Sequence, residues 1–206
     1  MSHSDTYSLP RTAFAPESIA EALAQHGACL IEGFPAPAHS EQLRTDLQHL
    51  AAEGQLKPAA IGRAGSHQER SDLRGDNTLW LDDPRCSEAA EDYLTQLDTL
   101  RSALNRLLFL GLKEVEAHYA LYSPGTRYTR HRDRFRDSDA RVVTLVSYLN
   151  PEWQADDGGQ LRLYRNGGHI DVYPHISTSL CFLSELEHEV LPTHRDRLSI
   201  AAWLRR

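Results

Sequence analysis

The chain has 206 residues, of which 40% are hydrophobic and 25% are charged, a composition typical of one globular domain that can bury its own core. Its formal net charge of −7 opposes a polyanionic partner, so nucleic acid is a disfavoured ligand. The cysteines are widely separated and form no CxxC pair, which argues against a disulfide framework or a zinc ribbon. Neither an apolar leader nor a run of the ~18 apolar residues that cross a bilayer is present. We therefore expect a cytoplasmic monomer without membrane contact.

The N-terminal half has helical patterning after a polar segment, residues 1–10, that we expect to be a flexible tail. Three helices are predicted from their apolar periodicity and their end signals. They are PESIAEALAQHG, with Pro16 in its first turn and Gly27 as its stop; SEQLRTDLQHLAAEG, with Ser40 as its N-cap; and EAAEDYLTQLDTLRSALNRLLFLG, which follows Ser87 and ends at Gly111. A short strand, ACLIEGF, separates the first two.

The segment IGRAGSHQERSDLRGDNTLW lies between the second and third predicted helices. It is charged and shows no clear periodicity before Trp80, which predicts a long loop. A solvated connection and a functional lid share this composition, so both interpretations stay open.

Beyond Gly111 the pattern changes to short β-prone runs separated by turn signals. The runs are VEAHYALY, RYTRH, RVVTLVSYL, QLRLY, HIDVY, SLCFL, HEV and LSIAAWL. No helix is long enough to bridge them, so we predict a closed or double-sheet antiparallel barrel over residues 112–206. Residues 11–111 would form a helical support, and residues 11–206 a single domain.

The stretch YTRHRDRF contains a candidate metal site. Residues two apart on a strand point to the same face, so His131 and Asp133 can project together into the barrel. An imidazole and a carboxylate are two of the three ligands in the triad that holds non-haem Fe(II). Among the later histidines His188, at the start of HEV, is the best third ligand. HxD alone is a weak pattern, and an ion-paired strand rim is the competing interpretation.

Arg197 follows the turn LPTHRD and begins the apolar run LSIAAWL. Hairpin pairing would place it on a strand adjacent to that of His188. A buried guanidinium requires an anionic partner, and its planar fork of donors suits a carboxylate. Either a local acid or the far carboxylate of a metal-chelating dicarboxylate would satisfy it.

Several linked motifs in one order give the sequence a family resemblance. They are RGDNTLW, ALYSPGTRYTRHRD, VSYLNPEW, GGQLRLY and HEVLPTHRDRLSIAAW. Together they resemble the Fe(II)- and 2-oxoglutarate-dependent prolyl 4-hydroxylases, specifically the hypoxia-inducible-factor prolyl hydroxylase branch and its bacterial relatives. The resemblance implies a mainly β fold, the double-stranded β-helix or jelly-roll barrel, with N-terminal helices packed on its outside.

The resemblance also implies site residues, because positions in these motifs match functional positions of the family. His131, Asp133 and His188 match the iron ligands, and Arg197 matches the arginine that pairs with 2-oxoglutarate. The remaining matched positions are Tyr148 and Tyr122 for the cosubstrate, Tyr128, Trp203 and Ala201 for the surrounding pocket, and Arg74 with Asp76 for the substrate entry. Plain barrel packing is an equally open interpretation of the tyrosines and Trp203. Ala201 departs from the family, since animal members carry a hydroxyl there, and residues 62–73 become a lid candidate.

The implied activity is hydroxylation of a prolyl residue at C4 in a protein substrate, with O2 consumed and succinate and CO2 as coproducts. A translation factor such as elongation factor Tu is the candidate substrate, and ascorbate is a further candidate cofactor. Two alternatives stay open. One is an oxygenase of a small molecule or nucleobase, and the other is a non-catalytic sensor module that binds metal or 2-oxoglutarate.

Overall fold

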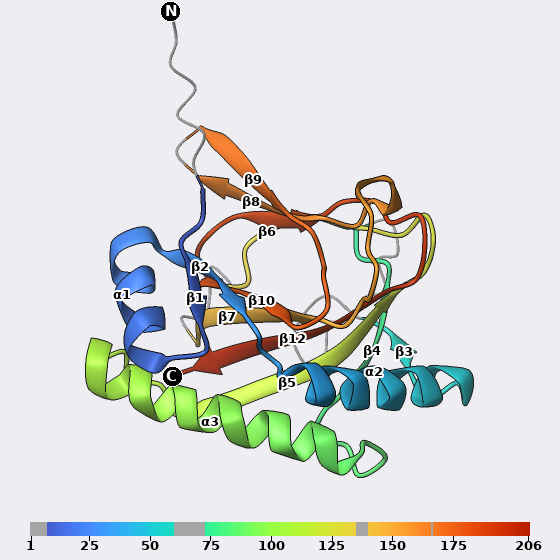
Figure 1. Ribbon diagram of the computed structural model, residues 1–206, viewed down its shortest axis with the longest axis horizontal. Helices are drawn as coiled ribbons and strands as arrows, with labels where there is room; N and C mark the ends of the chain where they lie inside the picture. The colour runs from blue at the N-terminus through green and yellow to red at the C-terminus, as the bar shows by residue number, and fades with distance from the viewer. Residues whose placement is uncertain (1–7, 60–72, 135–139, 166) are drawn as a thin grey trace, which may run out of the picture.

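A computed structural model describes residues 8–59, 73–134, 140–165 and 167–206 of the chain. Two β-sheets face each other, and helices cover the outer face of the larger sheet (Figure 1). Most of the expected flexible tail and of the lid candidate, residues 62–73, lies outside the described residues.

The larger sheet has eight strands and the smaller has four. In spatial order the larger sheet contains β1 (Arg11–Ala13), β2 (Ala28–Glu32), β10 (Thr178–Leu183), β7 (Arg141–Tyr148), β12 (Arg197–Arg205), β5 (Glu114–Tyr122), β4 (Asp76–Trp80) and β3 (Lys57–Pro58). The smaller sheet contains β6 (Tyr128–His131), β11 (His188–Val190), β8 (Leu161–Arg165) and β9 (Gly168–Val172). Every pairing is antiparallel except that of β1 with β2.

The predicted strands after Gly111 are all present, as β5 to β12. The N-terminal part contributes more strands than expected, because β1 to β4 extend the larger sheet at its two ends. Asp76–Trp80, predicted as part of a loop, is strand β4. Its inward positions carry polar and aromatic side chains, so the apolar alternation that marks a strand is missing.

Three α-helices are present, α1 (Pro16–His26), α2 (Pro37–Ala52) and α3 (Glu88–Leu108), with a short 3₁₀ helix at Ala155–Asp157. The predicted ends of α1 are confirmed. Pro16 begins the helix, and Gly27 ends it in the left-handed region at φ 69°, where its N–H bonds the carbonyl of Leu23. Glycine adopts this conformation without steric cost. None of the helices in the described chain has the length and apolar character needed to cross a membrane.

The other two helices differ from prediction at one end each. Helix α2 begins at Pro37, so Ser40 is not its N-cap. Proline fits the first turn because that turn needs no backbone donor, and the buried Ser40 hydroxyl instead donates to the carbonyl of Pro35 at 2.9 Å. Helix α3 follows Ser87 as expected but stops before Gly111, with Phe109 in the left-handed region.

Because side chains alternate along each strand, the larger sheet has one face that packs under the helices and one that faces the cavity. On β12 the apolar residues Leu198, Ile200, Ala202 and Leu204 join the core beneath the helices. The alternate residues, Arg197, Ser199, Ala201 and Trp203, line a cavity between the sheets. One face of each central strand therefore stabilises the fold, while the other is available for a functional site.

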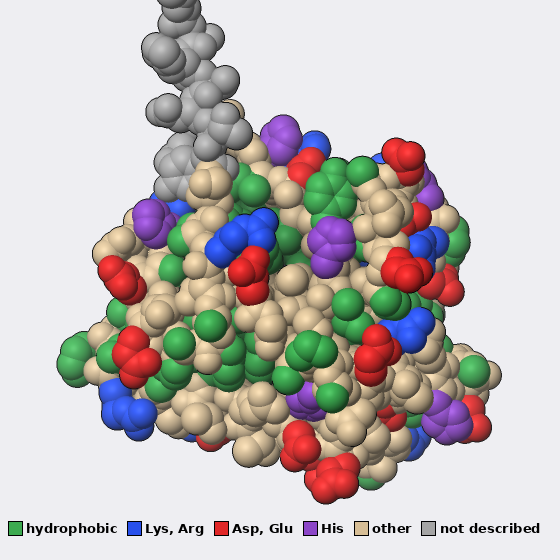
Figure 2. All heavy atoms as spheres, viewed as in Figure 1, with side chains coloured by type: hydrophobic (Ala, Val, Ile, Leu, Met, Phe, Trp, Pro, Cys, Tyr) green, Lys and Arg blue, Asp and Glu red, His purple; other side chains and the backbone are tan. Residues whose placement is uncertain are grey.

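Charged side chains are dispersed over the surface. Figure 2 shows acidic and basic groups interspersed on the face it presents. The arginines near His131 are also paired with acids, since Arg130 and Arg132 both contact Glu187 and Arg134 contacts Glu185. Two carboxylates therefore offset part of the positive charge of these three arginines.

Candidate functional site

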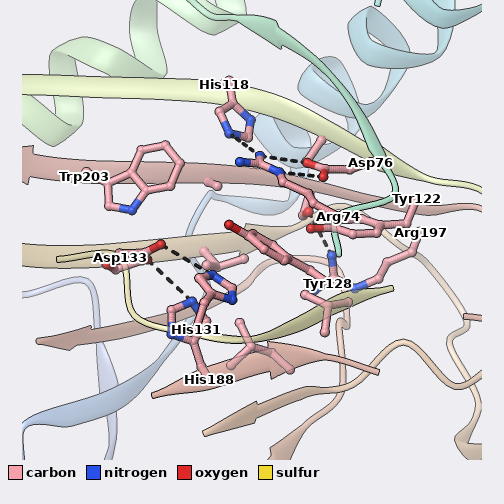
Figure 3. A pocket seen from close by; sticks show the side chains of 17 residues that line it. Arg74, Asp76, His118, Tyr122, Tyr128, His131, Asp133, His188, Arg197 and Trp203 are labelled. Carbon is pink, nitrogen blue, oxygen red and sulfur yellow. Dashed lines mark hydrogen bonds and ion pairs between the residues drawn. The ribbon is translucent and has the colours of Figure 1, made fainter. Parts of the chain in front are cut away.

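Two histidines and an aspartate converge at one edge of the cavity (Figure 3). His131 ends β6, His188 begins β11, and the two residues are direct cross-strand partners. The Asp133 carboxylate lies between them, with Oδ1 3.6 Å from Nε2 of His131 and Oδ2 3.5 Å from Nε2 of His188. One ligand atom from each residue falls within 4.8 Å of the others, so the three can hold a metal ion.

Hydrogen bonds orient the three side chains. Nδ1 of His131 lies 2.7 Å from the carbonyl of Thr129, and Nδ1 of His188 lies 3.1 Å from the carbonyl of Leu186. A carbonyl can only accept, so both Nδ1 atoms carry a proton, and in the neutral form of each ring Nε2 presents a lone pair. The Thr144 hydroxyl donates to Oδ2 of Asp133 at 2.9 Å.

Burial and mutual charge set the protonation of this group. Burial lowers the pKa of His188 to about 4, although the neighbouring carboxylate opposes the shift. Burial alone would raise the pKa of Asp133, but His188 and His131 outweigh it and hold that pKa well below its usual range. At neutral pH His188 is a neutral imidazole and Asp133 a carboxylate, which are the forms that bind a cation.

Arg197 lies in the same cavity and is 1% exposed. Its Nε donates to the carbonyl of Gly159 at 2.8 Å, and its Nη1 donates to the hydroxyl of Ser199 at 3.0 Å. Nη2 is buried and has no hydrogen-bond partner within the described residues. None of the described acids pairs with this guanidinium, which therefore retains donor capacity for an anion.

Two tyrosines flank the Arg197 guanidinium. Its central carbon lies 5.2 Å from the ring of Tyr122 and 5.4 Å from the ring of Tyr148. The Tyr148 hydroxyl is buried without a hydrogen-bond partner in the described chain, and burial raises its pKa, so it stays protonated. A protonated hydroxyl and a free guanidinium donor in the same region form a binding site suited to a carboxylate.

The glycine pair before β8 lets the chain pass close to Arg197. Gly159 has φ 65°, and a Cβ there would lie 3.0 Å from Cδ of Arg197 and 3.1 Å from Oγ1 of Thr193. At Gly158 a Cβ would approach the carbonyl oxygen of Pro192 to 2.4 Å. Side chains at these positions would displace the Gly159 carbonyl, which accepts the hydrogen bond from Nε of Arg197.

A second arginine borders the cavity near the metal-ligand candidates. Arg74 donates from Nε to Oδ1 of Asp76 at 2.7 Å and from Nη2 to Oδ2 at 2.9 Å. Its guanidinium carbon lies 4.9 Å from the centre of the Tyr128 ring. That ring stacks on His131 with centroids 3.6 Å apart, so Arg74 is linked through Tyr128 to a candidate metal ligand.

The structure brings together the residues that the sequence singled out. The cavity is lined by His131, Asp133, His188, Arg197, Tyr122, Tyr128, Trp203, Ala201, Arg74 and Asp76. Tyr148 packs in the apolar cluster between the sheets and reaches Arg197 from there. The small Ala201 faces His118, its cross-strand partner.

Two steps of the sequence reasoning were wrong although the residues converge. Asp133 is not on a strand, because β6 ends at His131 and Asp133 follows in a bend. His188 and Arg197 are not on adjacent strands, because β11 belongs to the smaller sheet and β12 to the larger. The chain crosses between the sheets after β11, so the two side chains line the cavity from opposite sheets.

Sequence reasoning also missed lining residues. His118 and Thr144 line the cavity together with Ser199, and Gly159 contacts Arg197. A polar residue at an inward-facing position of a predicted barrel strand was the available signal for the first three.

Comparisons with known proteins agree with this geometry. A family profile described as the 2OG-Fe(II) oxygenase superfamily matches residues 117–205. The chain is 30% identical over 204 residues to human prolyl hydroxylase EGLN3, covering 92% of this chain and 82% of the relative. It is 28% identical over 207 residues to human Egl nine homolog 1, of which it spans 48%.

Solved structures are also similar. A Pseudomonas putida prolyl-4-hydroxylase superposes with a TM-score of 0.85 at 41% identity, covering 93% of this chain and 99% of that one. A Trichoplax adhaerens prolyl hydroxylase, solved with a peptide fragment of the hypoxia-inducible factor oxygen degradation domain, has a TM-score of 0.81 at 29% identity, covering 92% and 88%. Both neighbours have the barrel described above.

Proposed function

This chain belongs to the prolyl hydroxylases of the 2OG-Fe(II) oxygenase superfamily, and we propose that it hydroxylates C4 of a prolyl residue in a protein substrate. The single observation that carries the proposal is that Arg197, buried without an acidic partner among the described residues, shares one cavity with the candidate triad His131, Asp133 and His188. A dicarboxylate that chelates a metal at one end would satisfy both groups.

The donor set fits Fe(II). Two imidazole nitrogens and one carboxylate are the ligands that non-haem iron oxygenases use, and they leave further positions for substrates. His131, Asp133 and His188 would hold the ion, with Thr144 fixing the carboxylate. When bound, Fe(II) supplies the dioxygen activation that accompanies decarboxylation of 2-oxoglutarate to succinate and CO2.

The remaining residues would bind and orient the reactants. Arg197 donates to the far carboxylate of 2-oxoglutarate, helped by the Tyr148 hydroxyl, and Tyr122 walls the same region. Tyr128, Trp203 and the small Ala201 shape the cavity. Arg74 and Asp76 border the entry of the substrate, and the apolar strand residues behind the cavity exclude water from the reacting atoms.

The nature of the substrate is inferred from the relatives and from charge. The Trichoplax neighbour was solved with a peptide, which favours a protein substrate here, and elongation factor Tu is the first candidate. The pairing of Arg130 and Arg132 with Glu187 gives a nucleobase substrate no support. A sensor module without catalysis would bind 2-oxoglutarate but form no succinate.

The first experiment is an anaerobic titration of the metal-free protein with Fe(II) and 2-oxoglutarate, followed by the visible charge-transfer band of the chelated complex. We expect the band in the wild type, its loss in His188→Ala, and a large increase in the 2-oxoglutarate needed in Arg197→Ala. A folded wild type without the band would refute the metal site. Protein from a strain lacking the gene, incubated with enzyme, Fe(II), 2-oxoglutarate and O2, should then gain the mass of one oxygen atom on a prolyl peptide.

A further inference from the structure

His118 is a buried polar residue to which the proposed function assigns no role. It lies on β5 with 3% of its surface exposed. Its ring packs between two tryptophans, with centroids 5.3 Å from that of Trp80 and 5.2 Å from that of Trp203. On its third side it meets Arg74 (Figure 3).

The hydrogen bonds of His118 fix which ring nitrogen faces Arg74 as an acceptor. Nδ1 lies 2.9 Å from the carbonyl of Tyr119, so Nδ1 carries the proton and donates. Nε2 therefore has a lone pair, and it lies 3.2 Å from Nη2 of Arg74, which donates to it. Burial, reinforced by the charge of Arg74, lowers the pKa of His118 to about 4, which keeps the ring neutral at pH 7.

These bonds hold the Arg74 guanidinium along the edge formed by Nε and Nη2. Nη2 has two N–H groups, one for Asp76 and one for His118, and Nε is bound to Asp76. The Asp76 side chain is fully buried, whereas the Arg74 side chain keeps 15% exposure. Nη1 makes no hydrogen bond to any described residue, so it is the nitrogen that remains for a ligand.

Proline chemistry indicates what that ligand atom is. A prolyl residue has no backbone N–H, so its main chain offers only a carbonyl oxygen for recognition. A fixed guanidinium donor beside the cavity is suited to such an acceptor.

We propose that His118 is a positioning residue which, with Asp76, holds Arg74 so that Nη1 donates to a main-chain carbonyl oxygen of the peptide that carries the target proline. The inference rests on the proposed function, since it assumes a peptide substrate. It goes beyond that function by giving His118 a role in substrate affinity that acts through Arg74. A histidine that only packed would need no lone pair directed at Arg74.

Two amide variants separate positioning from packing. In His118→Gln the side-chain oxygen reaches the place of Nε2 and can still accept from Arg74. In His118→Asn the same amide is one methylene shorter and reaches only the place of Nδ1. The probe is lysate protein from a strain lacking the gene, titrated by dilution, with oxidised prolyl peptide as the readout. Thermal unfolding of both variants and the 2-oxoglutarate titration serve as controls.

We expect His118→Asn to raise the apparent KM for the probe about tenfold, as loss of a charge-assisted hydrogen bond predicts, with kcat changed far less. His118→Gln should restore a KM close to the wild-type value. Equal KM values for the two amides, or a fall in kcat at unchanged KM, would overturn the proposal.

A measurement without substrate separates failure of the positioning role of His118 from failure of the proposed hydroxylase function. In nitrogen-15 NMR spectra the Nη2 protons of Arg74 should exchange slowly in the wild type and in His118→Gln, and rapidly in His118→Asn. Slow exchange in His118→Asn would refute the positioning role whatever the substrate is. If instead the wild type oxidises no lysate protein, the proposed function fails, while the NMR spectra still decide whether His118 holds Arg74.

Discussion

Arg197 and Arg74 line the same cavity but balance their charge in different ways. Arg74 carries its own counter-ion, the buried Asp76, and a neutral histidine acceptor. Arg197 is bound only by a carbonyl and a hydroxyl, with Nη2 unpartnered in the described part of the chain. A buried charge without a partner costs several kcal/mol, which an incoming anion can offset.

The two arginines are therefore suited to different ligands. A guanidinium already neutralised by a carboxylate has little electrostatic attraction left for a second one, but its free N–H can still bind a neutral carbonyl. A guanidinium without a counter-ion is suited to a carboxylate. We therefore assign the anionic cosubstrate to Arg197 and the uncharged peptide main chain to Arg74.

Removing Arg197, the arginine without a counter-ion, should have the strongest consequence for cosubstrate binding. Arg197→Ala should weaken 2-oxoglutarate binding about a thousandfold, because a bidentate charge-assisted interaction is lost. The free energy of unfolding without cosubstrate should change little, since the variant also removes an uncompensated buried charge. Anaerobic titration and urea denaturation measure the two quantities. Arg195→Ala, an exposed arginine two positions away, is the matched control, and an unchanged 2-oxoglutarate affinity in Arg197→Ala would contradict the assignment.

Removing the counter-ion of the balanced arginine should affect stability instead. Asp76→Asn keeps the shape of the side chain but leaves the Arg74 charge unpaired, which we expect to lower the free energy of unfolding by about 3 kcal/mol. Urea denaturation at pH 7 measures it. Adding Arg74→Met to Asp76→Asn should recover much of the loss, and a loss in Asp76→Asn below about 1 kcal/mol would show that solvent already screens the pair.

Sequence patterns predicted the strands from β5 onward because their apolar residues alternate and their turns contain proline and glycine. They missed β4, in which the polar Asp76 points into the cavity and a regular apolar alternation is missing. No local pattern singled out His118 either, because it stands on β5 in line with the polar residues Glu114 and Glu116. The prediction that β11 pairs with the next strand, β12, was also wrong. The chain crosses between the sheets there, and this crossing is a property of the whole barrel that no local pattern encodes.

The candidate ligands were predictable for a different reason. His131, Asp133, His188 and Arg197 are residue types with few structural uses inside a barrel, so their positions in the motifs were informative. The geometric reasons given for them were wrong at Asp133 and between His188 and Arg197, as described above. Chemical type therefore indicated which residues would share the cavity better than strand periodicity did.

The pH dependence of stability tests whether the histidine beside Arg74 is neutral. The pKa of His118 is lowered to about 4 from the usual 6.5, so the unfolded chain takes up its proton first as pH falls. The free energy of unfolding should therefore decline by at most about 3 kcal/mol on account of this residue between pH 6.5 and pH 4. Below pH 4 this contribution should level off. Urea denaturation of metal-free protein should show a shallower decline in His118→Gln than in the wild type. His169→Gln, at an exposed histidine, should retain the wild-type slope; equal slopes in all three proteins would mean that His118 is not a buried neutral group.

Two buried tyrosines with different hydroxyl partners should respond differently to replacement by phenylalanine. The Tyr148 hydroxyl has no partner among the described residues, whereas the Tyr119 hydroxyl donates to Asp46 at 2.8 Å. Tyr148→Phe should therefore weaken 2-oxoglutarate binding about tenfold, the loss of one hydrogen bond to a charged group, without lowering stability. Tyr119→Phe should lower stability by about 1 to 2 kcal/mol and leave 2-oxoglutarate affinity unchanged. If the two variants behaved alike in the titration, the Tyr148 hydroxyl would be a packing defect, and Arg197 alone would account for recognition of the carboxylate.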